Sequence, residues 1–271
     1  MIRKFLNAYA FVFARRRFAK LNRLIFLIGA RGLGILNCHS PFQSGEEPFL
    51  RQFLANYDSP EFVVMDVGAN QGQFASWVLS ATNKLKVVSF EPNPAAAQRL
   101  SVALSALADR HRLIPRGAAS APGEAIIFDY GTAEGSGHAT LYSDVLTTIR
   151  RSDCVASIPI QLSTIDGEVE AIQETVCLLK IDTEGHEKDV LLGALKLLRD
   201  SPPPAILIEF NEMNAVSGTH YFALQKLLGD AYASFRLLPG GQLLPLDRQL
   251  PFYTEIYAYQ NLVFLRRDLR Y

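Results

Sequence analysis

The residues best suited to bind a ligand follow short apolar runs of the chain. Asp66, Gly68, Asn70 and Gly72 lie at and after the run FVVMDV at 62–67. Glycines allow a tight turn and a close approach of the backbone to a ligand, and a helix that follows offers free N–H groups. A phosphate-binding P-loop requires a lysine directly after its last glycine, and none follows Gly72. A dinucleotide fingerprint requires a second glycine at the position that Asn70 occupies. The loop therefore predicts close contact with a ligand that carries little or no phosphate.

An acidic residue follows the next apolar run. Glu91 comes after KVVSF at 86–90 and 19 residues beyond Gly72, the position from which a carboxylate accepts both hydroxyls of a ribose. Asp66 would repel phosphate and attract a cationic ligand. S-adenosylmethionine meets these requirements, because it is a nucleoside with a sulfonium group and no phosphate. The alternative is that the glycines form an ordinary turn and that Glu91 only caps a helix.

Two later runs end in residues that could move a proton. Asp182 follows VCLLKI at 176–181, His186 comes four residues later, and Glu209 lies near the end of AILIEF at 205–210. A sugar hydroxyl is a poor nucleophile while it is protonated, so His186 or Asp182 could serve as its base. Glu209 is the third candidate catalytic residue and is expected beside Asp182. Asp182 and Glu209, with Asn211, could instead hold Mg²⁺, which prefers oxygen ligands; we expect no metal. A third interpretation is that Asp182 only caps the helix that follows.

The surrounding pattern predicts the elements that position these residues. Short apolar runs alternate with amphipathic segments, which is typical of an α/β fold with a doubly wound, mainly parallel sheet. In such a sheet ligands bind at the carboxyl ends of the strands, where the residues above are expected. The stretch 131–144 is predicted to be a loop, and its His138 is the other histidine expected within reach of a ligand. The predicted strands are 62–67, 86–90, 112–118, 125–128, 158–162, 176–181, 205–210, 235–238 and 262–265, and the predicted helices are 73–81, 95–108, 187–199 and 221–228.

Composition excludes several classes of protein. The chain has 271 residues, of which 49% are hydrophobic and 20% charged, so it is not disordered as a whole. Its 27 basic and 27 acidic residues give no argument for a nucleic-acid partner, and none is expected. Cys38, Cys154 and Cys177 lie far apart, which suits neither a disulfide framework nor a zinc site. We expect a cytoplasmic enzyme.

The N-terminal segment differs from the rest in charge. Residues 1–45 contain eight basic residues and no acid. Their apolar runs are far shorter than the roughly 20 residues needed to cross a bilayer. Basic and apolar residues at helical spacing could lie on an anionic membrane surface. We expect instead that two helices here pack on the domain, because 21–36 is apolar enough to favour burial.

Several motifs together resemble the FkbM-type methyltransferases. The resemblance rests on VMDVGANQG at 64–72, FEPNP at 90–94, LLKIDTEGHE at 178–187 and ILIEF at 206–210, in the same order and spacing. It implies a class I, Rossmann-like methyltransferase fold over 46–271, after an N-terminal helical extension at 1–45. It also implies S-adenosylmethionine as cofactor and usually oxygen as the methyl acceptor. The residues expected to bind the cofactor are Asp66, Gly68, Asn70, Gly72, Glu91 and Asn93.

The expected function is transfer of a methyl group from S-adenosylmethionine to a hydroxyl of a glycan or secondary metabolite. A nicotinamide-linked oxidoreductase is an alternative, against which Asn70 and the absence of a Tyr-x-x-x-Lys pair both count. A second alternative is a non-catalytic scaffold that keeps the fold, since a fold alone does not prove activity. The sequence identifies neither the acceptor nor the oligomeric state.

Overall fold

The apolar runs assemble into one large sheet. The computed structural model describes residues 1–38, 40–130, 139–142 and 155–269. The eight strands have the order β10-β9-β11-β8-β7-β1-β2-β3, and neighbours from β3 to β8 are parallel. β11 is antiparallel to β8 and β9, and β10 is antiparallel to β9. The predicted doubly wound, mainly parallel sheet is therefore confirmed. The strands are β1 (Phe62–Val67), β2 (Lys86–Phe90), β3 (His111–Ile114), β7 (Thr175–Ile181), β8 (Ala205–Phe210), β9 (Tyr232–Leu237), β10 (Leu243–Pro245) and β11 (Gln260–Arg266).

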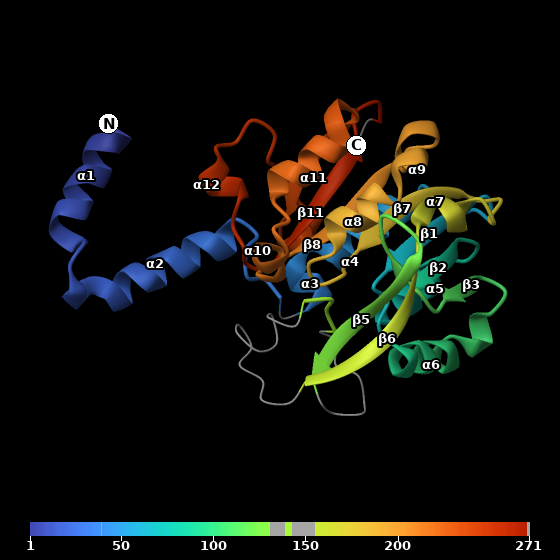
Figure 1. Cartoon of the computed structure of the whole chain (residues 1–271). Helices are drawn as coiled ribbons and strands as arrows, with labels where there is room; N and C mark the ends of the chain where they lie inside the picture. The colour runs from blue at the N-terminus through green and yellow to red at the C-terminus, as the bar shows by residue number, and fades with distance from the viewer. Residues whose placement is uncertain (39, 131–138, 143–154, 270–271) are drawn as a thin grey trace.

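Helices cover both faces of this sheet (Figure 1). Alternate residues of β1 point to opposite sides, so Met65 packs in one core and Val64 in the other. The Val64 core contains α4 (Glu46–Leu54), α5 (Gln73–Ala81) and α6 (Pro94–Ala103), and the Met65 core contains α8 (Glu187–Leu192), α9 (Leu195–Asp200) and α11 (Tyr221–Leu228). Shorter helices are α3 (Pro41–Ser44), α7 (Ile165–Val169), α10 (Met213–Ser217) and α12 (Pro251–Thr254).

A second sheet of three strands has the order β4-β6-β5 and comprises β4 (Gly117–Ala118), β5 (Gly123–Tyr130) and β6 (Val155–Ser163). The predicted strand over 112–118 is divided between the two sheets. The division falls at Pro115, which has no backbone N–H to donate to a strand neighbour. Long β5 and β6 run side by side in Figure 1 and bring Ile127 and Ile160 towards the carboxyl ends of the main sheet.

The predicted helix over 187–199 is wrong at its centre, where the structure has the two helices α8 and α9. A Cβ at Gly193 would lie 2.0 Å from the carbonyl oxygen of Ala119, so only glycine allows this close backbone approach. The Asp166 carboxylate then accepts hydrogen bonds from two backbone N–H groups in the first turn of α9, each at 2.8 Å. The break turns Leu195 outward, where 47% of it is exposed.

The predicted packing of the N-terminal helices on the domain is also wrong. α1 (Ile2–Phe13) has no buried residue, and α2 (Ala19–Gly32) buries only Ala30. Figure 1 shows both helices extending away from the sheet, so most of their apolar surface meets no described part of the body. Just after α2, Ile35 is buried and the backbone N–H of Leu36 donates to the carbonyl of Tyr259 at 2.8 Å. Among the described residues, no helix has the length and apolar content to span a bilayer.

Candidate active site

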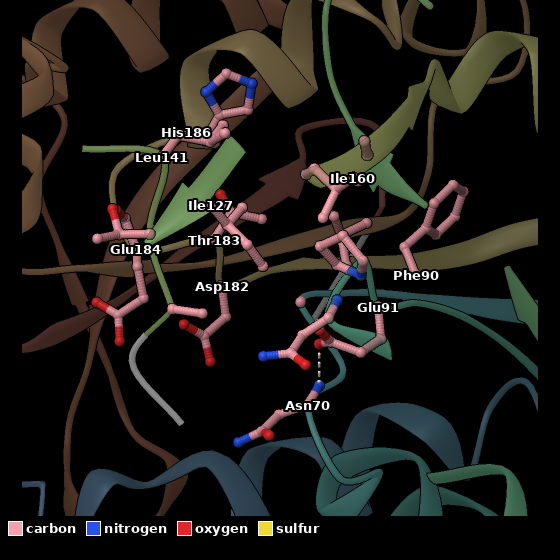
Figure 2. Close-up of a pocket in the computed structure, with 18 of the residues that line it drawn as sticks. Asn70, Phe90, Glu91, Ile127, Leu141, Ile160, Asp182, Thr183, Glu184 and His186 are labelled. Carbon is pink, nitrogen blue, oxygen red and sulfur yellow. Dashed lines mark hydrogen bonds between the residues drawn. The ribbon is translucent and has the colours of Figure 1, made fainter. Parts of the chain in front are cut away.

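A cavity opens at the carboxyl ends of β1, β2 and β7, under the edge of the small sheet (Figure 2). Six of the nine predicted site residues line it, namely Gly68, Asn70, Glu91, Asn93, Asp182 and His186. Its apolar wall includes Phe90, Ile127 and Ile160. We call it the first cavity. Three strand ends that are far apart in the sequence therefore meet around one space.

Glu91 forms one wall of the first cavity and holds two loops. Its Oε2 accepts a hydrogen bond from the backbone N–H of Asn70 at 2.7 Å, and its Oε1 accepts one from the N–H of Asn93 at 2.8 Å. Burial raises the pKa of Glu91 to about 7, although these two hydrogen bonds oppose the rise. Each carboxylate oxygen has a second lone pair, so Glu91 can still accept two hydroxyl groups from a ligand.

Asn93 has a structural role at the same corner. Its Oδ1 accepts a hydrogen bond from the backbone N–H of Ala95 at 3.0 Å and caps α6, whose first residue is Pro94. Its Nδ2 donates to Asp129 of β5 at 3.3 Å. Asn93 thus connects the segment after β2 to the small sheet, and this connection holds the two in place beside the first cavity.

The loop after β1 takes its shape from backbone that favours glycine and asparagine. Gly68 has φ +79°, and Asn70 has φ 48°. A Cβ on Gly68 would lie 1.8 Å from the carbonyl oxygen of Asp182, so the loop packs directly on the end of β7. Gly72 does not line the first cavity. It is the residue directly before α5 and has φ 83°. Among the described residues, Oδ1 of Asn70 is buried without a hydrogen-bond partner, which leaves it available to a ligand.

Gly68→Ala should destabilise the protein more than Gly218→Ala. Both glycines have positive φ, +79° and +70°, but a Cβ at Gly218 would meet nothing within 4 Å. Both variants lose about 1–2 kcal/mol because alanine disfavours this backbone region. Gly68→Ala should lose about 1–3 kcal/mol more, because its Cβ overlaps the Asp182 carbonyl. Urea unfolding of the two variants measures this difference, and equal midpoints would contradict the close contact.

A buried lysine links two of the predicted acids. Asp66 of β1 pairs in register with Lys180 of β7. Nζ of Lys180 lies 3.3 Å from Oδ1 of Asp66 and 3.2 Å from Oδ2 of Asp182. Burial by itself lowers the pKa of Lys180, but Asp182, Asp66 and Glu46 outweigh it and raise the pKa above its usual value. Lys180 therefore stays positively charged between the acids. Asp66 is fully buried, and it lines neither the first cavity nor a second one on the α4 and α5 side of the strand ends.

A second cavity lies on the α4 and α5 side of the same strand ends. Glu46, Gln73, Trp77, Lys180, Asp182 and Glu209 are among the residues that line it. Asp182, Gly68 and Asn70 line both cavities, so they form the boundary between them. The side chain of Asp182 is 30% exposed, and Figure 2 shows it among the residues that line the first cavity. Two chambers thus meet at one carboxylate.

Glu209 lies in β8, the neighbour of β7, at the level of Asp182, because Ile181 pairs with Ile208. Burial and the nearby charges of Asp182 and Glu184 raise the pKa of Glu209 well above its usual value. Nδ2 of Asn211 donates to Oε1 of Glu209 at 3.0 Å and to Oε2 of Glu184 at 3.3 Å. The structure therefore brings Asp182 and Glu209 together, as predicted.

His186 lies apart from this pair. Its ring is at the other end of the first cavity, well away from the Asp182 carboxylate (Figure 2). Burial lowers its pKa, against the effect of Asp189, whose Oδ2 is 3.7 Å from Nδ1 of His186. His138 and most of the predicted loop 131–144 lie outside the described residues. Within 139–142, Oγ1 of Thr140 donates to the carbonyl of Glu184 at 3.0 Å and joins this segment to the turn after β7.

Three residues of the site were not predicted. Lys180 stands two residues before Asp182 on the same strand, and this period-two spacing places both on one face. Glu46 begins α4 and reaches the second cavity, a placement that only the fold reveals. Glu187 is buried, and its Oε1 accepts hydrogen bonds from the N–H groups of Thr183 and Gly185 at 3.2 and 2.9 Å. Glu187 shapes the turn that carries Asp182.

Among the described residues, no group of three or more histidine, cysteine, aspartate or glutamate side chains is arranged to hold a metal ion. The ammonium group of Lys180 lies 3.2 Å from Oδ2 of Asp182. That group supplies the positive charge facing the acids of this site.

Comparison with known proteins places these features in a family. Residues 66–236 match the family model of the methyltransferase FkbM domain. The chain is 29% identical over 160 residues to the 2-O-methyltransferase NoeI of Sinorhizobium fredii, covering 55% of this chain and 63% of that one. It is 28% identical over 159 residues to the hexuronic acid methyltransferase AglP of Haloferax volcanii, covering 57% and 59%. The chain thus matches about three-fifths of the length of each relative.

Among solved structures, an FkbM methyltransferase from Methylobacillus flagellatus aligns with 76% of this chain and 44% of its own, at 18% identity and a TM-score of 0.45. The family model covers more than half of the chain and contains the Asp66, Glu91, Asp182 and Glu209 strand ends described above. The chain belongs to the FkbM methyltransferase family.

Proposed function

We propose that this protein transfers a methyl group from S-adenosylmethionine to a hydroxyl group of a glycan. The observation that carries the proposal is the position of Asp182, which lines both the first and the second cavity. A transferase needs a donor chamber and an acceptor chamber that meet at the reacting atoms. The names of the two relatives, a 2-O-methyltransferase and a hexuronic acid methyltransferase, support oxygen and a sugar as the acceptor.

The first cavity fits the nucleoside part of the cofactor. Glu91 offers lone pairs to two ribose hydroxyls, and the apolar surfaces of Phe90, Ile127 and Ile160 suit a flat base. The unpartnered Oδ1 of Asn70 is a further acceptor on the same wall. When bound, S-adenosylmethionine supplies a methyl group on a positively charged sulfur. Asp182, at the boundary between the cavities, favours that charge.

The second cavity fits a sugar. Its carboxylates, Glu46 and Glu209, can accept hydrogen bonds from hydroxyl groups, and the side chain of Trp77 offers an aromatic surface. The guanidinium of Arg51 lies 5.7 Å from the centre of the Trp77 ring and holds one side of it. An acceptor here would present a hydroxyl to Asp182 from the side opposite to the cofactor.

The proposed reaction moves one methyl group and one proton. The bound cofactor would supply the methyl group that replaces the proton on the acceptor oxygen, and Asp182 would accept that hydroxyl proton. Lys180 keeps Asp182 oriented through its 3.2 Å contact. Glu209, whose pKa is raised, lies beside Asp182 and can share the proton. The position of His186 at the far end of the first cavity favours Asp182 as the base.

Cofactor affinity should rise as the pH increases through about 7. The pKa of Glu91 is raised to about 7, so a large part of this group is protonated at neutral pH in the free protein. Ribose hydroxyls donate to the ionised carboxylate, so binding favours loss of that proton. Below this pKa, the affinity should fall up to about tenfold per pH unit. Calorimetric titration with S-adenosylhomocysteine measures the slope.

The Glu91→Gln variant is the control for this pH dependence, because it cannot ionise and its affinity should be independent of pH. The pKa of Glu187 is also raised to about 7 by burial. A slope that survives in Glu91→Gln would therefore assign the titration to Glu187 and contradict the prediction.

Two measurements test the proposed function. Calorimetry with S-adenosylhomocysteine and with NAD compares the cofactor classes; we expect binding of the first only. Binding of NAD alone would support the oxidoreductase, and binding of neither would support the non-catalytic scaffold. Incubation with isotope-labelled S-adenosylmethionine and a panel of oligosaccharides, followed by mass spectrometry, should show label on a sugar oxygen. Label on nitrogen or carbon would contradict the O-methyl assignment.

A further inference from the structure

Two helices at the start of the chain form an arm that the reaction chemistry does not use. α1 and α2, joined by a 3₁₀ turn at Arg16–Phe18, extend away from the body (Figure 1). We call residues 1–32 the N-terminal arm. All side chains of α1 are at least partly accessible, and Ala30 is the single buried residue of α2. The arm must therefore be soluble on its own or have a partner.

The exposed surface of the arm is apolar in an ordered way. Leu21, Leu24, Ile25 and Ile28 follow the i, i+3, i+4, i+7 spacing of one helix face, and all four are exposed. Ile2, Phe5, Leu6 and Val12 form a similar exposed stripe on α1. An isolated exposed leucine needs no explanation, but two consecutive helices with such faces indicate an interaction surface.

The charge of the arm indicates what that surface meets. The arm carries Arg3, Lys4, Arg15, Arg16, Arg17, Lys20, Arg23 and Arg31, and no acid occurs before Glu46. With 27 basic and 27 acidic residues in the whole chain, the rest of the chain has 19 basic and 27 acidic residues. The arm of one molecule therefore repels the arm of another, while it attracts an anionic surface.

We propose that the N-terminal arm lies on an anionic lipid bilayer, with the apolar faces of α1 and α2 in the headgroup region and the basic residues among the lipid phosphates. Basic residues with interleaved leucine, isoleucine and phenylalanine on a helix of high amphipathicity are the pattern of such interfacial helices. α2 has 14 residues, and a helix that crosses a bilayer needs about 20. The arm lies on the bilayer and does not cross it.

Sedimentation with vesicles tests the proposal on the full chain. The protein should bind vesicles of phosphatidylcholine and phosphatidylglycerol in equal parts, fail to bind pure phosphatidylcholine, and be released by high salt. Replacing Arg15, Arg16 and Arg17 together by glutamine should weaken binding by about 10²-fold. No binding to the mixed vesicles would overturn the proposal, as would equal binding to both kinds.

A matched pair of variants separates the apolar face from general surface effects. Leu24→Glu with Ile28→Glu replaces side chains that are 55% and 64% exposed, so the fold loses no core contact. This double variant should abolish vesicle binding, whereas Val102→Glu, at a 70% exposed position of α6, should leave it unchanged. Light scattering in the same samples tests a second copy as the occupant. A dimer that the Leu24 and Ile28 replacements dissociate, without vesicle binding by the wild type, would overturn the lipid assignment.

Discussion

Replacing Glu91 by alanine is expected to raise the dissociation constant for S-adenosylhomocysteine by at least about 10²-fold. The proposed complex loses two hydrogen bonds to a charged group, each of which contributes about 1.5–3 kcal/mol. The variant also frees the backbone N–H groups of Asn70 and Asn93, which Glu91 holds at 2.7 and 2.8 Å. Both loops that shape the first cavity therefore lose an anchor. Isothermal calorimetry measures the change.

Glu124→Ala is the control for this variant, because Glu124 is an exposed acid of β5 that lines neither cavity and whose Oε1 accepts a hydrogen bond from Gln161. Its dissociation constant should equal that of the wild type. If Glu91→Ala remains folded by circular dichroism and binds S-adenosylhomocysteine normally, the ribose does not lie at the end of β2.

Asp182→Asn should lower turnover by at least about 10²-fold, the lower limit for the loss of a general base. Asparagine keeps the size of the side chain and an oxygen that can accept a hydrogen bond from Lys180, whose Nζ lies 3.2 Å from Oδ2 of Asp182 in the wild type. The protein should therefore fold and bind the cofactor within a few-fold of the wild type. Initial rates of methyl transfer, measured beside calorimetry, separate the effect on chemistry from the effect on binding.

Two further variants distinguish the candidate bases. Asp189→Asn is the matched control for Asp182→Asn, because it is the same change at a nearby aspartate, one that contacts His186. This control substitution should change turnover little. His186→Ala should retain most activity. Burial lowers the pKa of His186 below its ordinary value. A loss as large as that of Asp182→Asn, together with the disappearance of an acidic limb from the pH profile, would instead assign the base to His186. Near-normal turnover of Asp182→Asn would show that Asp182 and the turn after β7 have a structural role and not a catalytic one.

The strand ends of the site could be predicted because buried parallel strands have a clear sequence pattern. β1, β2, β7 and β8 coincide with the predicted runs within one residue, and Asp66, Glu91, Asp182 and Glu209 lie at or after the ends of those runs. Parallel strands in a doubly wound sheet all end at one edge. The residue types at that edge then predicted a ribose, a positive charge and a proton acceptor.

The contacts between those ends could not be predicted, because they depend on register and on segments outside the motifs. The β1–β7 pairing shifts at Val63 and Val64, so the match of Asp66 with Lys180 does not follow from counting residues. Glu46 reaches the site only because α4 packs against the sheet. Gly193 has the spacing of a helix interior, and the carbonyl of Ala119 that breaks the helix is 74 residues away in the chain.

The boundary at Asp182 also bears on how the protein can change over evolution. Glu91 and Asn93 belong to the first cavity, whereas Gln73 and Trp77 on α5 belong to the second. With donor and acceptor placed in the two cavities as proposed, substitutions on the α4 and α5 wall would alter which acceptor is admitted without touching Glu91 and Asn93. A laboratory search for new acceptors should randomise that wall first. Descendants of one ancestral transferase can in this way share a donor while their products diverge.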